Sequence, residues 1–159
     1  MKTVKAAIEV NATQKYVLSQ KARKYYEDFG NLTIAVLGLT FKPGTDDLRE
    51  APSLVNIPVF LDDGAYVKAW DPVGVDNFKK WIKDENLTYC DTVEETLQNA
   101  DICFIFTEWP EVKETKFDIF EKLMKKPIIM DGRNCFLLDD ARASHVIYES
   151  IGREIISTL

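Results

Sequence analysis

Three basic and two aromatic side chains stand in short polar segments that each follow an apolar run. They are Lys42, Arg49 and Arg133, together with Phe41 and Trp109. Lysine and arginine bind phosphates and carboxylates through charge-assisted hydrogen bonds, and aromatic rings commonly line pockets for small molecules. If the fold brings these segments together, the residues predict a pocket for an anion attached to a flat or apolar body. Taken singly, each also fits a solvated surface side chain.

The apolar runs predict strands, and the amphipathic segments between them predict helices. Strands are expected at residues 33–37, 66–70, 88–89, 102–106, 128–130 and 146–148. Helices are expected near residues 53–63, 75–83, 93–100, 117–124 and 138–143. Such alternation is typical of an α/β fold with a parallel sheet covered on both faces. Right-handed crossovers then favour a Rossmann-like sheet of about six strands in the order 3-2-1-4-5-6.

This topology predicts where a ligand binds. In an open α/β sheet, ligands lie at the carboxyl edge where the strand order reverses, here between the strands at 33–37 and 102–106. The segments 38–49, 107–111 and 131–134 follow strands that end at this edge. They carry all five of the basic and aromatic residues, so the sequence predicts that these residues converge on one pocket.

A long helix is expected to precede the sheet, over residues 3–28. Apolar residues recur near helical spacing, and Gly30 ends the run. No capping residue precedes the first apolar positions, so we expect this helix to be part of a longer one. Its apolar positions would associate in water if they were exposed, and a two-fold pair of chains through this helix is therefore expected.

The composition excludes several classes of protein. A length of 159 residues with 46% apolar and 29% charged residues fits one globular domain. The net charge of −6 argues against nucleic-acid binding, which needs a basic surface. No apolar stretch is long enough to cross a bilayer, so no membrane partner is expected. Cys90, Cys103 and Cys135 form neither a disulfide framework nor a metal motif, and a cytoplasmic location is expected.

The segment after the first strand, residues 38–53, is not a dinucleotide-binding loop. Gly38 and Gly44 are too far apart for the pattern G-x-G-x-x-G. A Rossmann-like sheet is therefore predicted without the turn that seats the pyrophosphate of NAD on a helix N-terminus. Asp46 and Asp47 are expected to tether the turn of this segment.

Five stretches, in order along the chain, resemble the signatures of the UDP-glucose/GDP-mannose dehydrogenase family. They are Gly38–Pro43 with Asp46–Pro52, Asp71–Val73, Thr107–Glu111, Asp131–Asn134 and Tyr148–Arg153. In addition, Ile8–Asn11 with Gln14 resembles part of the long central helix of that family. The resemblance covers nearly the whole chain and is closest to the bacterial and archaeal members that oxidise UDP-glucose.

The resemblance implies a role for each matched residue. Phe41 and Lys42 match positions that contact the UDP-sugar, and Arg133 matches an arginine of the same substrate site. Arg49 matches an arginine that reaches the NAD held by another domain of these enzymes. Residues 1–30 would be a remnant of the central linking and dimerisation helix, and residues 31–159 would be the Rossmann-like domain that binds the UDP-sugar.

The resemblance also implies which chemistry this chain lacks. Members of the family oxidise the C6 alcohol of the sugar to a carboxylate by two hydride transfers to two NAD molecules, through a cysteine thiohemiacetal. The NAD-binding domain and the catalytic cysteine belong to other regions of such enzymes. No catalytic residue is therefore expected here, and the chain is not expected to be active without a partner that supplies the NAD-binding half.

Two alternatives remain open. The chain could be a stand-alone module that binds UDP-sugars without catalysis. It could also be the same domain from an enzyme that acts on a UDP-N-acetyl-hexosamine or on GDP-mannose. UDP-glucose is the favoured ligand on the matched motifs.

Overall fold

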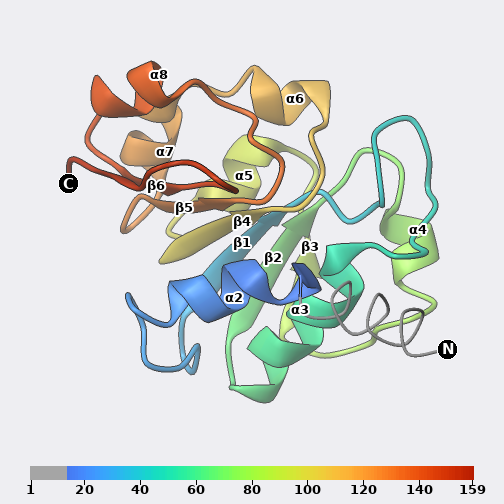
Figure 1. Ribbon diagram of the computed structural model, residues 1–159. Coiled ribbons are helices and arrows are strands. Elements are labelled where there is room, and N and C mark those ends of the chain that lie inside the picture. The colour runs from blue at the N-terminus through green and yellow to red at the C-terminus, as the bar shows by residue number, and fades with distance from the viewer. Residues whose placement is uncertain (1–13) are drawn as a thin grey trace, which may run out of the picture.

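The apolar runs of the sequence form one seven-stranded sheet in the computed structural model, which describes residues 14–159 (Figure 1). The strand order is β3-β2-β1-β4-β5-β6-β7. All neighbouring pairs from β3 to β6 are parallel, and only β7 runs antiparallel to its neighbour. The strands are β1 Thr33–Leu37, β2 Tyr66–Trp70, β3 Leu87–Tyr89, β4 Ile102–Ile105, β5 Ile128–Asp131, β6 Ile147–Glu149 and β7 Ile156–Ser157.

Helices cover both faces of the sheet, as Figure 1 shows. One face carries α2 Val17–Ala22, α3 Pro52–Asp62 and α4 Val75–Phe78. The other face carries α5 Val93–Leu97, α6 Pro110–Lys113, α7 Phe117–Leu123 and α8 Leu138–Arg142. No helix among residues 14–159 combines the length and the apolar character that a membrane span requires.

Each central strand is buried on both faces, which explains why its sequence is a continuous apolar run. In β1, Ile34 and Val36 point into the core under α2 and α3, whereas Ala35 and Leu37 point into the core under α5 and α7. Aromatic rings fill the first core. The Phe60 ring lies 5.0 Å from that of Phe29 and 4.6 Å from that of Phe104, spacings that are favourable for aromatic pairs.

The predicted strand order is confirmed, and the first two strands have the predicted bounds. Apart from shifts of a few residues in other bounds, three features of residues 31–159 differ from the prediction. The helix α4 ends at Phe78 rather than near Lys83, and both α6 and β7 were not predicted. Both missed elements are too short for a periodic pattern. The strand β7 has two residues and forms only because Ile156 lies opposite Tyr148 of β6.

The long N-terminal helix expected over residues 3–28 is not supported. Residues 3–13 lie outside the part of the chain that the structure describes, and α2 ends at Ala22. Side chains beyond that point bind the sheet. Lys24 Nζ and the Tyr25 hydroxyl each bond to Glu149 of β6, at 2.8 and 3.0 Å, and Phe29 is fully buried in the core. These tertiary contacts require the chain to turn after α2, although the spacing of apolar residues predicted a helix up to residue 28.

The centre of the sheet provides a test of the fold. Replacing Phe104 by alanine removes a fully buried ring that contacts Phe29, Phe60 and Phe106. We expect the free energy of unfolding, measured by urea denaturation, to fall by about 3–5 kcal/mol. Trp81→Ala is the control, because Trp81 is 67% exposed; its effect should stay within about 0.5 kcal/mol. A loss below about 1 kcal/mol for Phe104→Ala would contradict this packing.

Candidate functional site

A buried carboxylate, Asp71, holds the loops of the carboxyl edge together. It follows β2 directly, and its Oδ2 accepts the backbone N–H groups of Leu39 and Thr40 at 2.8 and 3.2 Å. The same oxygen accepts the indole N–H of Trp109 at 2.9 Å. Its Oδ1 accepts two further N–H groups, at 2.9 and 2.7 Å, from the turn that follows β2. One side chain thus fixes the loops after β1, β2 and β4.

The loops after β1 and β4 pass each other at very close range. Gly38 has φ of +93°, and a Cβ atom there would lie 2.4 Å from the Cβ of Thr107. Only glycine fits such a position. The Thr107 hydroxyl donates to the carbonyl of Thr40 at 2.6 Å, which joins the two loops beyond the crossing point. This is the point between β1 and β4 where the strand order reverses.

A second buried carboxylate fixes the loop after β5. The Oδ1 of Asp131 accepts the backbone N–H of Arg133 at 2.8 Å. Its Oδ2 accepts the N–H of Cys135 at 2.7 Å and the hydroxyl of Tyr148 at 2.6 Å. Burial, together with the charge of Asp131, raises the pKa of Tyr148, so this hydroxyl stays a donor. Arg153 in turn donates to the Tyr148 hydroxyl at 2.8 Å.

Arg133 reaches the edge where the sequence predicted it. Its guanidinium Nε and Nη2 lie 2.8 and 2.7 Å from Oε2 of Glu108, which belongs to the loop after β4. Oε1 of Glu108 is buried and has no hydrogen-bond partner within residues 14–159, so this carboxylate can still accept a hydrogen bond.

A small cavity of about 180 Å³ lies beside Arg133 on the face that carries α2 and α3. Its lining comes from the start of α3, the residue after β4, the loops after β5 and β6, and α2 with the residues just before it. The lining residues are Gln14, Lys15, Leu18, Pro52, Phe106, Gly132, Arg133 and Ile151. Lys15 was not predicted, because nothing in the helical pattern of its segment distinguishes it from a solvated lysine.

Phe41, Lys42 and Arg49 do not line this cavity. They lie on the loop between β1 and α3, where the Phe41 side chain is 41% exposed and Lys42 is also exposed. The exposed guanidinium of Arg49 pairs with Asp47, with Nη2 at 2.9 Å from Oδ2, and lowers the pKa of Asp47 to about 2. Asp47 also accepts the backbone N–H of Arg49 at 2.9 Å, which confirms its expected role in the turn.

Trp109 does not line the pocket as predicted. Its side chain is buried in the core under α5 and α7, and its indole N–H is bonded to Asp71. The thiols of Cys103 and Cys135 are also unsuited to nucleophilic chemistry, because burial and the charge of Asp131 raise the pKa of both. Among residues 14–159, no group of histidine, cysteine and acidic side chains could hold a metal ion.

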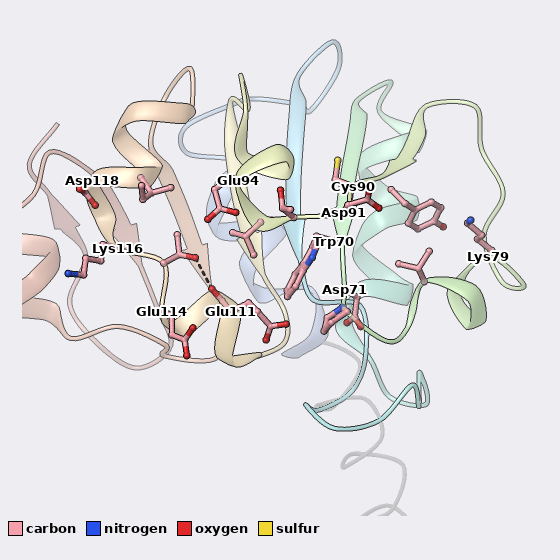
Figure 2. A pocket seen from close by; sticks show the side chains of 17 residues that line it. Trp70, Asp71, Lys79, Cys90, Asp91, Glu94, Glu111, Glu114, Lys116 and Asp118 are labelled. Carbon is pink, nitrogen blue, oxygen red and sulfur yellow. Dashed lines mark hydrogen bonds between the residues drawn. The ribbon is translucent and has the colours of Figure 1, made fainter.

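A larger hollow of the described chain is a poor site for an anion. It measures about 1040 Å³ and opens at the carboxyl ends of β2 and β3. Figure 2 shows carboxylates around it, among them Glu94, Glu111, Glu114 and Asp118, with only two lysines. A phosphate would be repelled there. The smaller cavity with Lys15 and Arg133 is the better candidate for an anionic ligand.

Comparisons with known proteins identify relatives of this chain. A sequence profile described as "UDP-glucose/GDP-mannose dehydrogenase family, UDP binding domain" matches residues 35–137. UDP-glucose 6-dehydrogenase TuaD of Bacillus subtilis is 40% identical over 98% of this chain, which covers 33% of that protein. UDP-glucose 6-dehydrogenase of Rickettsia bellii is 37% identical over 97% of this chain, which covers 36% of it. This chain therefore spans about a third of the length of the curated relatives it matches.

Solved structures show the same fold. A UDP-glucose dehydrogenase from Pyrobaculum islandicum superposes with a TM-score of 0.74 and 26% identity, over 91% of this chain and 31% of that one. An NDP-N-acetyl-D-galactosaminuronic acid dehydrogenase from Methanosarcina mazei superposes with a TM-score of 0.68 and 26% identity, over 89% of this chain and 29% of that one.

The role of Asp71 can be tested by Asp71→Asn. An amide keeps the shape of the carboxylate but turns an N–H group toward donors that need an acceptor. We expect the free energy of unfolding in urea to fall by about 3 kcal/mol. Asp76→Asn is the control, since Asp76 is exposed in the first turn of α4 and should cost less than about 1 kcal/mol. Equal stability of Asp71→Asn and the unmodified chain would show that the loops do not need this charge.

Proposed function

This chain belongs to the UDP-glucose/GDP-mannose dehydrogenase family as its UDP-binding domain, and we propose that it holds the nucleotide of UDP-glucose for an NAD-dependent UDP-glucose 6-dehydrogenase. The oxidation itself would use parts of the enzyme other than this domain. The names of the bacterial relatives favour UDP-glucose as the sugar nucleotide. The likeness to an enzyme of N-acetylated sugars keeps UDP-N-acetyl-hexosamines as the second choice.

The observation that carries this proposal is the cationic cavity at the carboxyl edge, beside the point where the strand order reverses. Ligands of open α/β sheets bind at that point. Arg133 lines the cavity, its backbone N–H is held by the buried Asp131, and its guanidinium is held by Glu108, so the side chain is in place before a ligand arrives. Lys42 and the exposed ring of Phe41 extend from the neighbouring loop. They are proposed to contact the part of the UDP-sugar that lies outside the cavity.

Arg49 is proposed to serve NAD rather than the sugar nucleotide. Its side chain is 88% exposed and is oriented by Asp47, so it projects from the domain toward solvent. A cation in that position is free to contact a dinucleotide held by a second domain. NAD would be bound mainly by that second domain, in the same polypeptide or in a separate chain.

The proposal also covers the division of the chain into segments, its pairing and its location. Residues 31–159 are proposed to be the nucleotide-binding unit, and residues 1–30 to derive from a helix that links it to the NAD-binding half. Pairing of two copies through that segment, and a cytoplasmic location, are part of the proposal. The link between the two segments is supported by Leu18 and Ala22 of α2, which pack on the sheet and so attach this segment to the nucleotide-binding unit.

Ligand binding tests the proposed function directly. UDP and UDP-glucose are expected to raise the melting temperature of the chain by mass action, and GDP-mannose to raise it less. In calorimetric titrations, Lys42→Ala and Arg133→Ala should each weaken UDP binding about tenfold, the effect of losing one charge-assisted hydrogen bond. Lys80→Ala, an exposed lysine beyond α4, is the matched control. Unchanged UDP affinity in Arg133→Ala would remove Arg133 from the site.

A further inference from the structure

We propose that Lys15 is a second cation of the site and binds the diphosphate of the nucleotide together with Arg133. This inference rests on the proposed function and names a residue that the sequence motifs did not indicate. Lys15 and Arg133 line the same cavity although they are 118 residues apart in the chain (133 minus 15). Between them the lining is largely apolar, with Leu18, Pro52 and Phe106.

Both cations are attached to buried polar side chains. The carbonyl of Lys15 accepts the amide N–H of Asn56 at 2.7 Å, and Asn56 is fully buried in α3. The same amide group donates to the carbonyl of Pro52 at 2.8 Å, another residue of the cavity lining. Arg133 is held by Asp131 in the equivalent way. The two positive groups are thus presented by fixed stretches of backbone on two sides of one cavity.

The present partner of Lys15 is easily displaced. Lys15 Nζ lies 2.6 Å from Oε2 of Glu50, yet the Lys15 side chain is 23% exposed and that of Glu50 is 69% exposed. An ion pair with such an exposed carboxylate contributes little, because water solvates the released carboxylate. A diphosphate carries more charge than a carboxylate and can bind both cations at once. It should therefore compete successfully with Glu50 for Lys15.

The size of the cavity fits phosphates and not a whole sugar nucleotide. A volume of about 180 Å³ lies below the roughly 300–1,000 Å³ of pockets that enclose a whole small-molecule ligand. The base and the sugar would then lie outside the cavity, near the loop that carries Phe41 and Lys42. The cavity thus accounts for the charged part of the ligand, and the exposed loop accounts for the rest.

Calorimetric titration of the full chain with UDP tests this inference. Lys15→Met is expected to weaken UDP binding about tenfold, whereas Lys15→Arg should keep most of the affinity. Glu50→Gln should tighten binding about threefold, because it removes the competing carboxylate. The double variant Lys15→Met with Glu50→Gln should bind as weakly as Lys15→Met alone. Lys21→Met is the matched control, since Lys21 lies in the adjoining helix α2 and does not line the cavity.

The outcomes separate this inference from the proposed function. Inorganic pyrophosphate should displace UDP from the unmodified chain, and uridine should not. If Lys15→Met binds UDP as tightly as the unmodified chain, or if Glu50→Gln weakens binding, Lys15 and Glu50 form only a structural tie and the inference is wrong. If the unmodified chain binds no UDP at millimolar concentration, the proposed function fails, and the inference fails with it.

Discussion

The architecture of this domain depends on one buried carboxylate, Asp71, at the point where β2 ends. A charged oxygen removed from water is tolerated only when hydrogen bonds replace its hydration. Asp71 obtains them from backbone N–H groups after β1 and β2 and from the indole of Trp109. The hydrogen bonds that the Asp71 carboxylate needs therefore fix the course of three loops. Asp131 does the same for the loop after β5, so two carboxylates flank the point where the strand order reverses.

This use of Asp71 explains how a Rossmann-like sheet can serve a ligand other than a dinucleotide. In dinucleotide-binding folds an acidic residue about 20 residues beyond the glycine-rich turn binds the ribose of the cofactor. Here both oxygens of the carboxylate after β2 are occupied by groups of the protein itself. The loop after β1 carries cations in place of a glycine-rich turn. The same edge of the sheet therefore offers side-chain charges to an anion instead of the free N–H groups of a helix.

The sequence predicted those parts of the fold that depend on local pattern and on the handedness of crossovers. The strands at 33–37 and 66–70 were predicted with their observed bounds, because a strand buried on both faces is a continuous apolar run. Long-range contacts decided the rest. The end of α2 depends on Glu149, more than a hundred residues away. The burial of Trp109 depends on Asp71. For the proposed site, Arg133 was predicted at the edge of the sheet. Lys15 was not predicted, because its position beside the cavity depends on the packing of α2.

That packing makes the segment before the sheet part of the site rather than a separate element. Beyond α2, Lys24 and Tyr25 bind the buried Glu149, and before α2 the carbonyl of Lys15 binds the buried Asn56. A buried ion pair adds little net stability, because its desolvation cost offsets its attraction, but leaving Glu149 unpaired would be costly. The contacts with Glu149 and with the Asn56 amide hold the chain on both sides of α2. The position of Lys15 beside the cavity therefore depends on two buried polar side chains that lie far from it in the sequence.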